Sequence, residues 1–516
     1  PTKRAGWKEL GSSRACESVF DGFVPSIRWQ RPPPAQGIEP EAFRGKLPPP
    51  ARGEVGSFEL EPAHHRTRCQ VRIAFIVDRF PAMSQTFVLR QMIGMMERGH
   101  EVTVFADAPG GDAESHEEVA RYGLLEKTRY FAVASSLVGR LKGGARLTAA
   151  VARRSPAWLL SLVRCLNPTL LGREALSLRA LHWYVPFMEG EFDVLQAHFA
   201  GSGVVGAVLK ALGVPGKLVT HFHGYGVRIA QRSGGGGFKR LFRQGDWFLA
   251  NSRYTYRQLL ALGVDPAKLS VLYPGVVSPS ELFDHPRQGQ KRDSGDKIKI
   301  VTVARLVDIK GVDVGLKVFK DLVEALEALP ALDLEYHLVG DGPCREELRL
   351  QVARDGLDDK VVFHGSLPFH ETLQVVQGAS FYLLPSREEA FGLASLEAQA
   401  SGVPVVAFRV GGVGETMVSG ETGFLVSPRD RGDMVEKARL LATNPTLRVE
   451  MGRRGRLWVK ERFGVESQNA KLEELYQRLL DEGDGSRRPE SPESPGSSES
   501  SESSERKVSE DDGTLR

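Results

Sequence analysis

The chain has 516 residues, which is long enough for two domains of ordinary size, and 41% of them are hydrophobic. Its formal net charge of +3 excludes the strong basic balance of a protein that depends on nucleic acid. The four cysteines form no CxxC pair, so they indicate neither a disulfide framework nor a metal knuckle, and they are consistent with a reducing cytoplasm. No apolar run is long enough to span a membrane.

Both ends of the sequence lack the periodicity of a packed domain. Residues 1–70 are rich in Pro, Arg and Gly, and residues 483–516 form an acidic, serine-rich tail. Both compositions predict disorder, because they cannot bury a core. Regular structure begins with the apolar run at Val71, so we expect the native chain to start at or near this residue, after an upstream extension.

Strand-like apolar runs alternate with helical patterns over residues 71–283. VRIAFIV from Val71 predicts a buried strand, FVLRQMIGMMERG a helix and EVTVFA a second strand, which together make a β–α–β unit. Four more short strands follow with helices between them, namely DVLQAHF, KLVTHFHG, WFLANS and LSVLYPG. This alternation predicts an α/β domain with a doubly wound parallel sheet.

A second alternation fills residues 298–463, after a polar segment at 284–297 that predicts a linker. A further helix over residues 464–482 lies beyond the second sheet. Two such domains in tandem predict a cleft between them, where the carboxyl ends of the strands of each sheet face one another.

The segment PSREEAFGLASLEAQASGVPVVAF predicts a loop, a helix and a buried strand. Glu389 lies in the loop at the helix N-terminus, and Glu397 lies further along the helix. A helix N-terminus suits a phosphate, and carboxylates accept hydrogen bonds from sugar or ribose hydroxyls. The pair therefore indicates a ligand site, although two glutamates at this spacing also occur in ordinary helices.

Two other motifs follow predicted strands of the second domain. Arg305 and Lys310 form a cation pair that suits a diphosphate, or else they are surface residues that flank a loop. Gly340 and Gly342 let the backbone approach a ligand closely, and they also fit a tight turn. The third glycine of a dinucleotide-binding motif is missing here, which weakens a nicotinamide or flavin hypothesis.

Together these motifs resemble the GT4 family of retaining glycosyltransferases, close to enzymes of colanic acid, capsular and exopolysaccharide biosynthesis. The resemblance runs from about Val71 to Tyr476 and includes VTVARLVDIKGVDVGL, HLVGDGPCREEL, FHGSL and GETGFLV. It implies the GT-B fold, with an acceptor-side first domain, a second domain that binds the nucleotide sugar, and a last helix that packs back on the first domain. It also implies an enzyme of the hexosyltransferase class.

The resemblance further implies transfer of a sugar from a nucleotide diphosphate sugar to a glycan or polyprenyl-linked acceptor, with retention of configuration. Arg305 and Lys310 stabilise the departing diphosphate, Glu389 orients the sugar and His223 steadies it near the reacting carbon. Glu397 holds the ribose. The other residues that the resemblance places around the donor are Gly340, Asp341, Gly342, Gly365, Ser366, Leu367, Phe391, Gly392 and Leu393.

Four polar residues near the predicted cleft are candidate contacts of donor or acceptor, namely Ser84, Gln85, His198 and His221. Helix capping and structural hydrogen bonds explain them equally well. The histidines also raise the alternative of a zinc site, but H-x-H without a third ligand at metal spacing is a weak signal. No D-x-D motif stands at a strand end either, so we expect no metal cofactor. Ala390 departs from the family pattern, which more often has glycine there.

Residues 137–183 are basic and amphipathic. Contact with an anionic membrane surface explains this pattern, and so does an ordinary helix with a solvated basic side. We expect a cytoplasmic protein, peripheral on the inner face of the membrane. Two other classes stay open: a nucleotide-sugar epimerase on the same fold, and a catalytically silent scaffold of a polysaccharide assembly complex.

Overall fold

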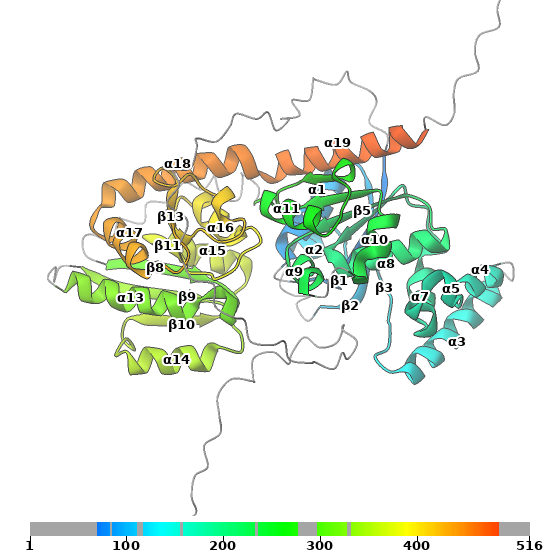
Figure 1. The fold of residues 1–516 in the computed structure, drawn as a ribbon, viewed down its shortest axis with the longest axis horizontal. Helices are drawn as coiled ribbons and strands as arrows, with labels where there is room; N and C mark the ends of the chain where they lie inside the picture. Colours follow the sequence, from blue (N-terminus) through cyan, green and yellow to red (C-terminus); the bar gives the residue numbers. More distant parts are fainter. Residues whose placement is uncertain are drawn as a thin grey trace, which may run out of the picture.

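The computed structural model describes residues 70–82, 85–110, 117–154, 158–232, 236–276, 297–327 and 332–484 (Figure 1). The predictions for the two ends of the chain therefore lie almost entirely outside the described residues. So does the predicted linker, except for Lys297, which begins a strand.

The first domain is built on a seven-stranded sheet whose strands all pair in parallel, in the order β3-β2-β1-β4-β5-β6-β7. Strand order reverses direction between β1 and β4, which makes the sheet doubly wound. The strands are β1 (Arg72–Phe80), β2 (Glu101–Pro109), β3 (Thr128–Tyr130), β4 (Val194–His198), β5 (Lys217–Phe222), β6 (Trp247–Ala250) and β7 (Leu269–Val271).

Helices connect these strands and cover the sheet. They are α1 (Thr86–Glu97), α2 (Glu117–Arg121), α3 (Leu137–Arg154), α4 (Trp158–Cys165), α5 (Pro168–Leu171), α6 (Arg173–Leu176), α7 (Arg179–Tyr184), α8 (Phe199–Leu212), α9 (Tyr225–Arg232), α10 (Lys239–Gln244) and α11 (Arg253–Ala261). Helices α3 to α7 lie together at the end of the molecule that is farthest from the second domain (Figure 1).

The second domain has a six-stranded parallel sheet in the order β10-β9-β8-β11-β12-β13. Its strands are β8 (Lys297–Val303), β9 (Asp333–Val339), β10 (Val361–Gly365), β11 (Phe381–Leu384), β12 (Val405–Phe408) and β13 (Gly423–Val426). Its helices are α13 (Val312–Leu326), α14 (Arg345–Arg354), α15 (Phe369–Gln377), α16 (Leu393–Ala400), α17 (Arg431–Thr443) and α18 (Pro445–Phe463), with the 3-10 helices η5 (Asp308–Lys310) and η6 (Val413–Glu415).

The central strands explain why the sequence shows unbroken apolar runs rather than alternation. Every residue of β4, β11 and β12 is buried, because helices cover both faces of a parallel sheet. The sequence predicted two α/β domains with parallel sheets from these runs, and the structure confirms this prediction.

The last helix, α19 (Val465–Asp484), runs from the second domain back along the first (Figure 1). Leu472, Leu475 and Tyr476 join the apolar core around β1 and α1. The hydroxyl of Tyr476 donates a buried hydrogen bond of 2.8 Å to Gln196 Oε1 in β4. The final helix therefore ties the two domains together.

Candidate active site

A pocket lies between the two domains, at the carboxyl ends of their strands. The first domain contributes His223 and Arg228, and the second contributes Arg305, Lys310 and Glu389. His223 follows β5, Arg305 follows β8 and Glu389 follows β11, so the topology explains why residues far apart in sequence meet here. The four residues predicted to be catalytic all line this one pocket, whereas Glu397, predicted to hold the ribose, is not part of its lining.

Lys310 and Glu389 form a partly buried ion pair across the pocket wall. Lys310 Nζ donates to Glu389 Oε1 at 2.6 Å, and the hydroxyl of Ser386 donates to the same oxygen at 3.1 Å. Gly311 keeps the two loops together, because a Cβ there would stand 2.1 Å from the carbonyl oxygen of Pro385. The carboxylate is therefore oriented by two donors.

Arg305 is exposed in the same pocket. Among the described residues, no carboxylate forms an ion pair with its guanidinium. The pocket lining thus holds two cations that are paired with carboxylates, Arg228 and Lys310, and one, Arg305, that is open to an anion such as a diphosphate.

The loop at Gly340 and Gly342 packs directly on the loop that carries Arg305. Both glycines have positive φ, and a Cβ would stand 2.0 Å from Ala304 O at the first and 2.5 Å from Leu306 O at the second. Backbone bonds join Leu306 N to Asp341 O and Gly340 N to Gly365 O. The glycines therefore serve a close backbone approach, and Gly365, Ser366 and Leu367 follow at the neighbouring strand end, outside the pocket lining.

Glu397 lies in α16, which follows the loop that carries Glu389. Its carboxylate is partly buried, no hydrogen bond from the described residues reaches it, and burial raises its pKa to about 7. Gly392 caps the helix in the left-handed conformation, with φ at 102°, and Leu393 begins it. Phe391 lies in the core instead, where it stacks on Tyr273 with ring centroids 5.3 Å apart.

Three histidines gather at the carboxyl ends of β4 and β5. His198 is paired with His221 across the two strands, and His198 Nδ1 lies 3.1 Å from His223 Nε2. One nitrogen of each ring lies within 4.8 Å of the others. Burial holds the pKa of each histidine well below its usual range, so all three are neutral. The sequence showed no third ligand at metal spacing from the H-x-H pair, and strand pairing brings His198 beside it.

His223 is the member of this cluster that borders the pocket. Its Nε2 atom faces His198, and its Nδ1 atom is buried without a hydrogen-bond partner among the described residues. A sugar that contacts a ring nitrogen of His223 therefore requires the imidazole to turn.

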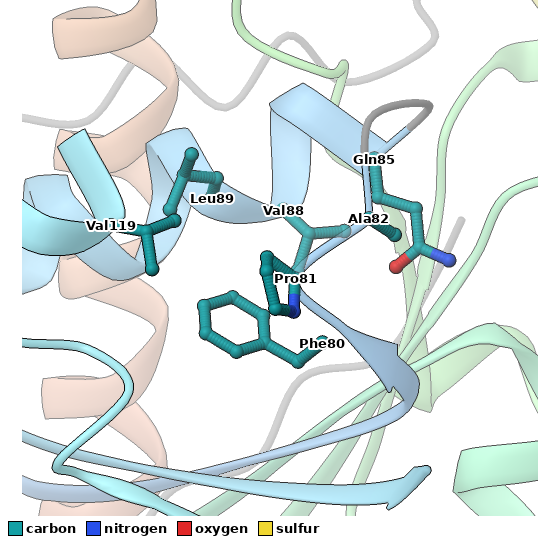
Figure 2. Close-up of a pocket in the computed structure, with 7 residues that line it drawn as sticks. All are labelled: Phe80, Pro81, Ala82, Gln85, Val88, Leu89 and Val119. Carbon is teal, nitrogen blue, oxygen red and sulfur yellow. The ribbon is translucent and has the colours of Figure 1, made fainter. Parts of the chain in front are cut away.

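The loop after β1 carries the candidate residues Ser84 and Gln85, and none of its described residues is part of the lining of this pocket. Ser84 is outside the described residues, and Gln85 donates from Nε2 to Asp78 Oδ1 at 3.1 Å. Gln85 also lines a small hollow with Phe80 and Pro81 at the start of α1 (Figure 2). Gln85 is not part of the lining of the pocket between the domains.

Several contacts between the domains were not foreseen from the sequence. Arg228 pairs with Glu388 at 3.2 Å, and the hydroxyl of Ser252 donates to the carbonyl of Ala390 at 2.7 Å. Glu415 accepts hydrogen bonds from backbone amides at the start of α11. No local motif announces such contacts, because each depends on how the two domains meet.

Comparison with known proteins matches the two parts of the chain to two family models. Residues 84–278 match the family model described as Glycosyltransferase Family 4, and residues 285–458 match Glycosyl transferases group 1. The chain is 31% identical to the Putative colanic acid biosynthesis glycosyltransferase WcaL of Salmonella typhimurium, over 70% of this chain and 88% of that protein. It is 28% identical to the Amylovoran biosynthesis glycosyltransferase AmsK of Erwinia amylovora, over 79% of this chain and 100% of that protein.

Solved structures share the fold. The Anabaena protein Alr3699/HepE, solved in complex with UDP and glucose, has a TM-score of 0.56 at 18% identity and covers 79% of this chain and 100% of its own. Sucrose-phosphate synthase from Thermosynechococcus elongatus has a TM-score of 0.59 at 19% identity, covering 80% and 100%. With its two parallel-sheet domains and both family matches, the chain belongs to the family 4 glycosyltransferases and has the GT-B fold.

Proposed function

We propose that this glycosyltransferase moves a sugar from a nucleotide diphosphate sugar to a glycan or lipid-linked acceptor, with retention, in exopolysaccharide biosynthesis. The observation that carries the proposal is the pocket in which His223, Arg305, Lys310 and Glu389 meet. The two relatives above are named for colanic acid and amylovoran biosynthesis, which supports an exopolysaccharide product. The epimerase and scaffold alternatives find no support in these relatives.

The proposed reaction is a displacement on the face of the sugar from which the diphosphate leaves. The bond from the anomeric carbon to the diphosphate oxygen breaks, the acceptor oxygen bonds to that carbon, and the acceptor proton passes to the departing phosphate. Arg305 and Lys310 stabilise the negative charge that grows on the diphosphate. Because two cations supply this stabilisation, the proposed transfer uses no metal ion.

Donor binding changes the partner of Lys310. The ammonium moves from Glu389 to the diphosphate, and the released carboxylate then orients hydroxyls of the donor sugar. The carboxylate of Glu397 accepts hydrogen bonds from the ribose hydroxyls of the donor, and the loops at Gly340 and Gly365 border the nucleotide base. Each charge-assisted contact contributes about 1.5–3 kcal/mol.

The direct test is calorimetric titration of the full chain with UDP-, GDP- and ADP-sugars. We expect one donor to bind, and Lys310→Ala to weaken it by roughly 10- to 100-fold through loss of one charge-assisted contact. Lys317→Ala removes an exposed lysine from α13 and is the matched control. If folded wild-type protein binds no member of the panel, the proposed function is wrong.

We also propose that the helical end of the first domain contacts anionic lipid. Large apolar side chains are exposed on and after α3 and α4, namely Leu137, Val138, Leu141, Val163, Leu166 and Leu176, with exposed basic residues among them. Among the described helices, none is long and apolar enough to cross a membrane. A surface of this kind lies on a bilayer rather than through it.

Vesicle sedimentation tests this surface. We expect the full chain to sediment with vesicles that contain phosphatidylglycerol and to stay in solution with neutral ones. Leu141→Asp reduces binding, whereas Leu457→Asp, at an equally exposed leucine of α18, leaves it unchanged. Equal binding by both variants would contradict the assignment of this surface.

A further inference from the structure

We propose that His198, His221 and His223 form a binding site for a divalent transition-metal ion of the zinc class, and that an ion bound there opposes donor binding. The claim that the ion opposes donor binding rests on the proposed function, whereas the metal site itself rests on the geometry of the three rings. The proposed transfer needs no metal, so this ion is an inhibitor or regulator rather than a cofactor.

Two features of the parallel sheet bring the rings together. His198 ends β4 and is the direct neighbour of His221 in β5. His223 follows His221 by two positions, so both side chains leave the chain on the same side. Imidazole is the side chain that zinc, copper and nickel ions bind most readily, and three protein ligands are enough for a zinc site.

The spacing of the nitrogens suits one ion. His198 Nδ1 and His223 Nε2 are 3.1 Å apart, close to the roughly 3.3 Å between two ligands of a tetrahedral zinc ion with Zn–N bonds of about 2.0–2.1 Å. One nitrogen of each of the three rings lies within 4.8 Å of the other two. Only small ring movements separate this cluster from coordination.

His221 has the hydrogen-bond arrangement of a metal ligand. Its Nε2 atom lies 3.0 Å from the carbonyl oxygen of Leu272, so Nε2 carries the proton and Nδ1 presents a lone pair. That Nδ1 atom is buried without a partner among the described residues. A backbone carbonyl that fixes the tautomer of a ligating histidine is the usual outer shell of a metal site.

The other two rings also keep buried nitrogens without protein partners, His198 Nε2 and His223 Nδ1. These two atoms lie on the opposite sides of their rings from the proposed ligand nitrogens, which face each other at 3.1 Å. Buried polar atoms are normally paired, so it is His221 Nδ1, a proposed ligand atom without a partner, that indicates a missing ligand. Phe75 stacks on His198, and Phe87 and Phe199 lie against His223. This apolar shell excludes water, while His223 opens to the pocket and gives an ion a path in.

An ion at this site fixes the imidazole of His223. A sugar that uses a ring nitrogen of His223 needs this ring to turn, so ion and donor compete for it. By linkage, the donor weakens ion binding by the same factor as the ion weakens donor binding.

The test uses Co²⁺ as a spectroscopic probe of the full chain, with any affinity tag removed. We expect one equivalent to bind with the visible absorption of a tetrahedral or five-coordinate ion, and Zn²⁺ to displace it. His221→Ala weakens binding by more than about 100-fold, because even outer-shell partners of metal ligands are worth about 10- to 100-fold. His337→Ala is the control, since His337 belongs to a pair with His364, 2.9 Å apart, that has no third histidine within the described part of the chain.

Wild-type protein that gives no cobalt spectrum overturns the proposal, whatever the variants do. An unchanged spectrum in His221→Ala, checked by a second variant, His198→Ala, also overturns it. The metal titration needs no donor, so its failure is separate from failure of the proposed function. If Zn²⁺ binds but leaves donor affinity in calorimetry unchanged, the competition is wrong and the metal site stands.

Discussion

Lys310 Nζ donates a 2.6 Å hydrogen bond to Glu389 Oε1, so the cation proposed for the donor phosphate is held by the carboxylate proposed for the donor sugar. Both side chains are partly buried, with exposed fractions of 20% and 13%, so solvent screens this pair less than it screens a surface salt bridge. In the proposed function, the diphosphate and the sugar therefore separate these two residues when the donor binds.

This pair predicts that Glu389→Gln separates binding from turnover. The amide no longer holds Lys310 by charge, so the affinity for free nucleotide diphosphate stays equal or rises. Turnover of the nucleotide sugar falls by roughly 10- to 100-fold, because an orienting contact at the reacting sugar is lost. Calorimetry with UDP or GDP and a transfer assay measure the two effects.

Glu436→Gln is the matched control, because Glu436 pairs with Arg439 on the surface of α17 and is not part of the pocket lining. A Glu389→Gln variant that loses affinity for the nucleotide itself would show that Glu389 acts on the phosphates, contrary to the assignment.

The buried carboxyl of Glu397 predicts a dependence of donor binding on pH. Its pKa is raised by burial from 4.5 to about 7. Ribose hydroxyls are best accepted by the ionised carboxylate, so donor affinity rises from pH 6 to pH 8. We expect donor affinity, measured by calorimetry, to change little between pH 6 and pH 8 in Glu397→Gln. If its affinity changes with pH as much as that of wild type, a group other than Glu397 causes the dependence.

The same shift predicts a change in stability. The folded-state pKa lies above the unfolded value, so Glu397 contributes stability below about pH 4.5 and this is lost as pH rises through 7. At pH 8 Glu397→Gln is therefore expected to unfold at a higher temperature than wild type, and at pH 4.5 the gain disappears. Calorimetric melting at both values measures the difference.

The sequence predicted the two sheets well, because their buried strands are continuous apolar runs such as VVAF in β12. It also predicted Arg305, Lys310 and Glu389 as separate site residues. It did not predict that Lys310 pairs with Glu389, because this depends on the loop approach at Gly311. Likewise, His198 joins the H-x-H pair only through the β4–β5 register, which the side chains of neither strand specify.

Gly224 and Ala390 meet across the boundary between the domains. Gly224 has φ at 97°, and a Cβ there would lie 2.1 Å from the Cβ of Ala390. Ala390, the departure from the family pattern, thus fills the space that Gly224 leaves empty. We predict that Gly224→Ala prevents this approach and lowers transfer by at least about 10-fold, since a misplacement of about 1 Å is costly in catalysis.

The double variant Gly224→Ala, Ala390→Gly separates the two causes. These causes are the clash between the Cβ atoms of residues 224 and 390 and the strain of placing an alanine at the positive φ of residue 224. The double variant removes the clash but keeps the strain, so we expect activity to return only in part. Ala390→Gly alone is expected to stay active in the transfer assay. Full loss of activity in Ala390→Gly would mean that the methyl group has a role of its own at the donor.

Glu415 joins the second domain to the start of a helix in the first. Its carboxylate accepts from the amides of Arg253 and Tyr254 at 2.7 and 2.9 Å, and from the hydroxyl of Tyr273 at 3.1 Å. A carboxylate at a helix N-terminus is favoured by the helix dipole and by unpaired amides. Glu415→Ala removes all three bonds, so we predict that the two domains separate more readily.

The expected cost is about 1.5–3 kcal/mol of interdomain contact, the range for a hydrogen bond to a charged group. Small-angle X-ray scattering would then give a larger radius of gyration for Glu415→Ala than for wild type, and saturating donor would restore it. Glu436→Ala, which removes a surface glutamate paired only within α17, is the control. Identical scattering by all three proteins would mean that α19 and the remaining contacts hold the domains together without Glu415.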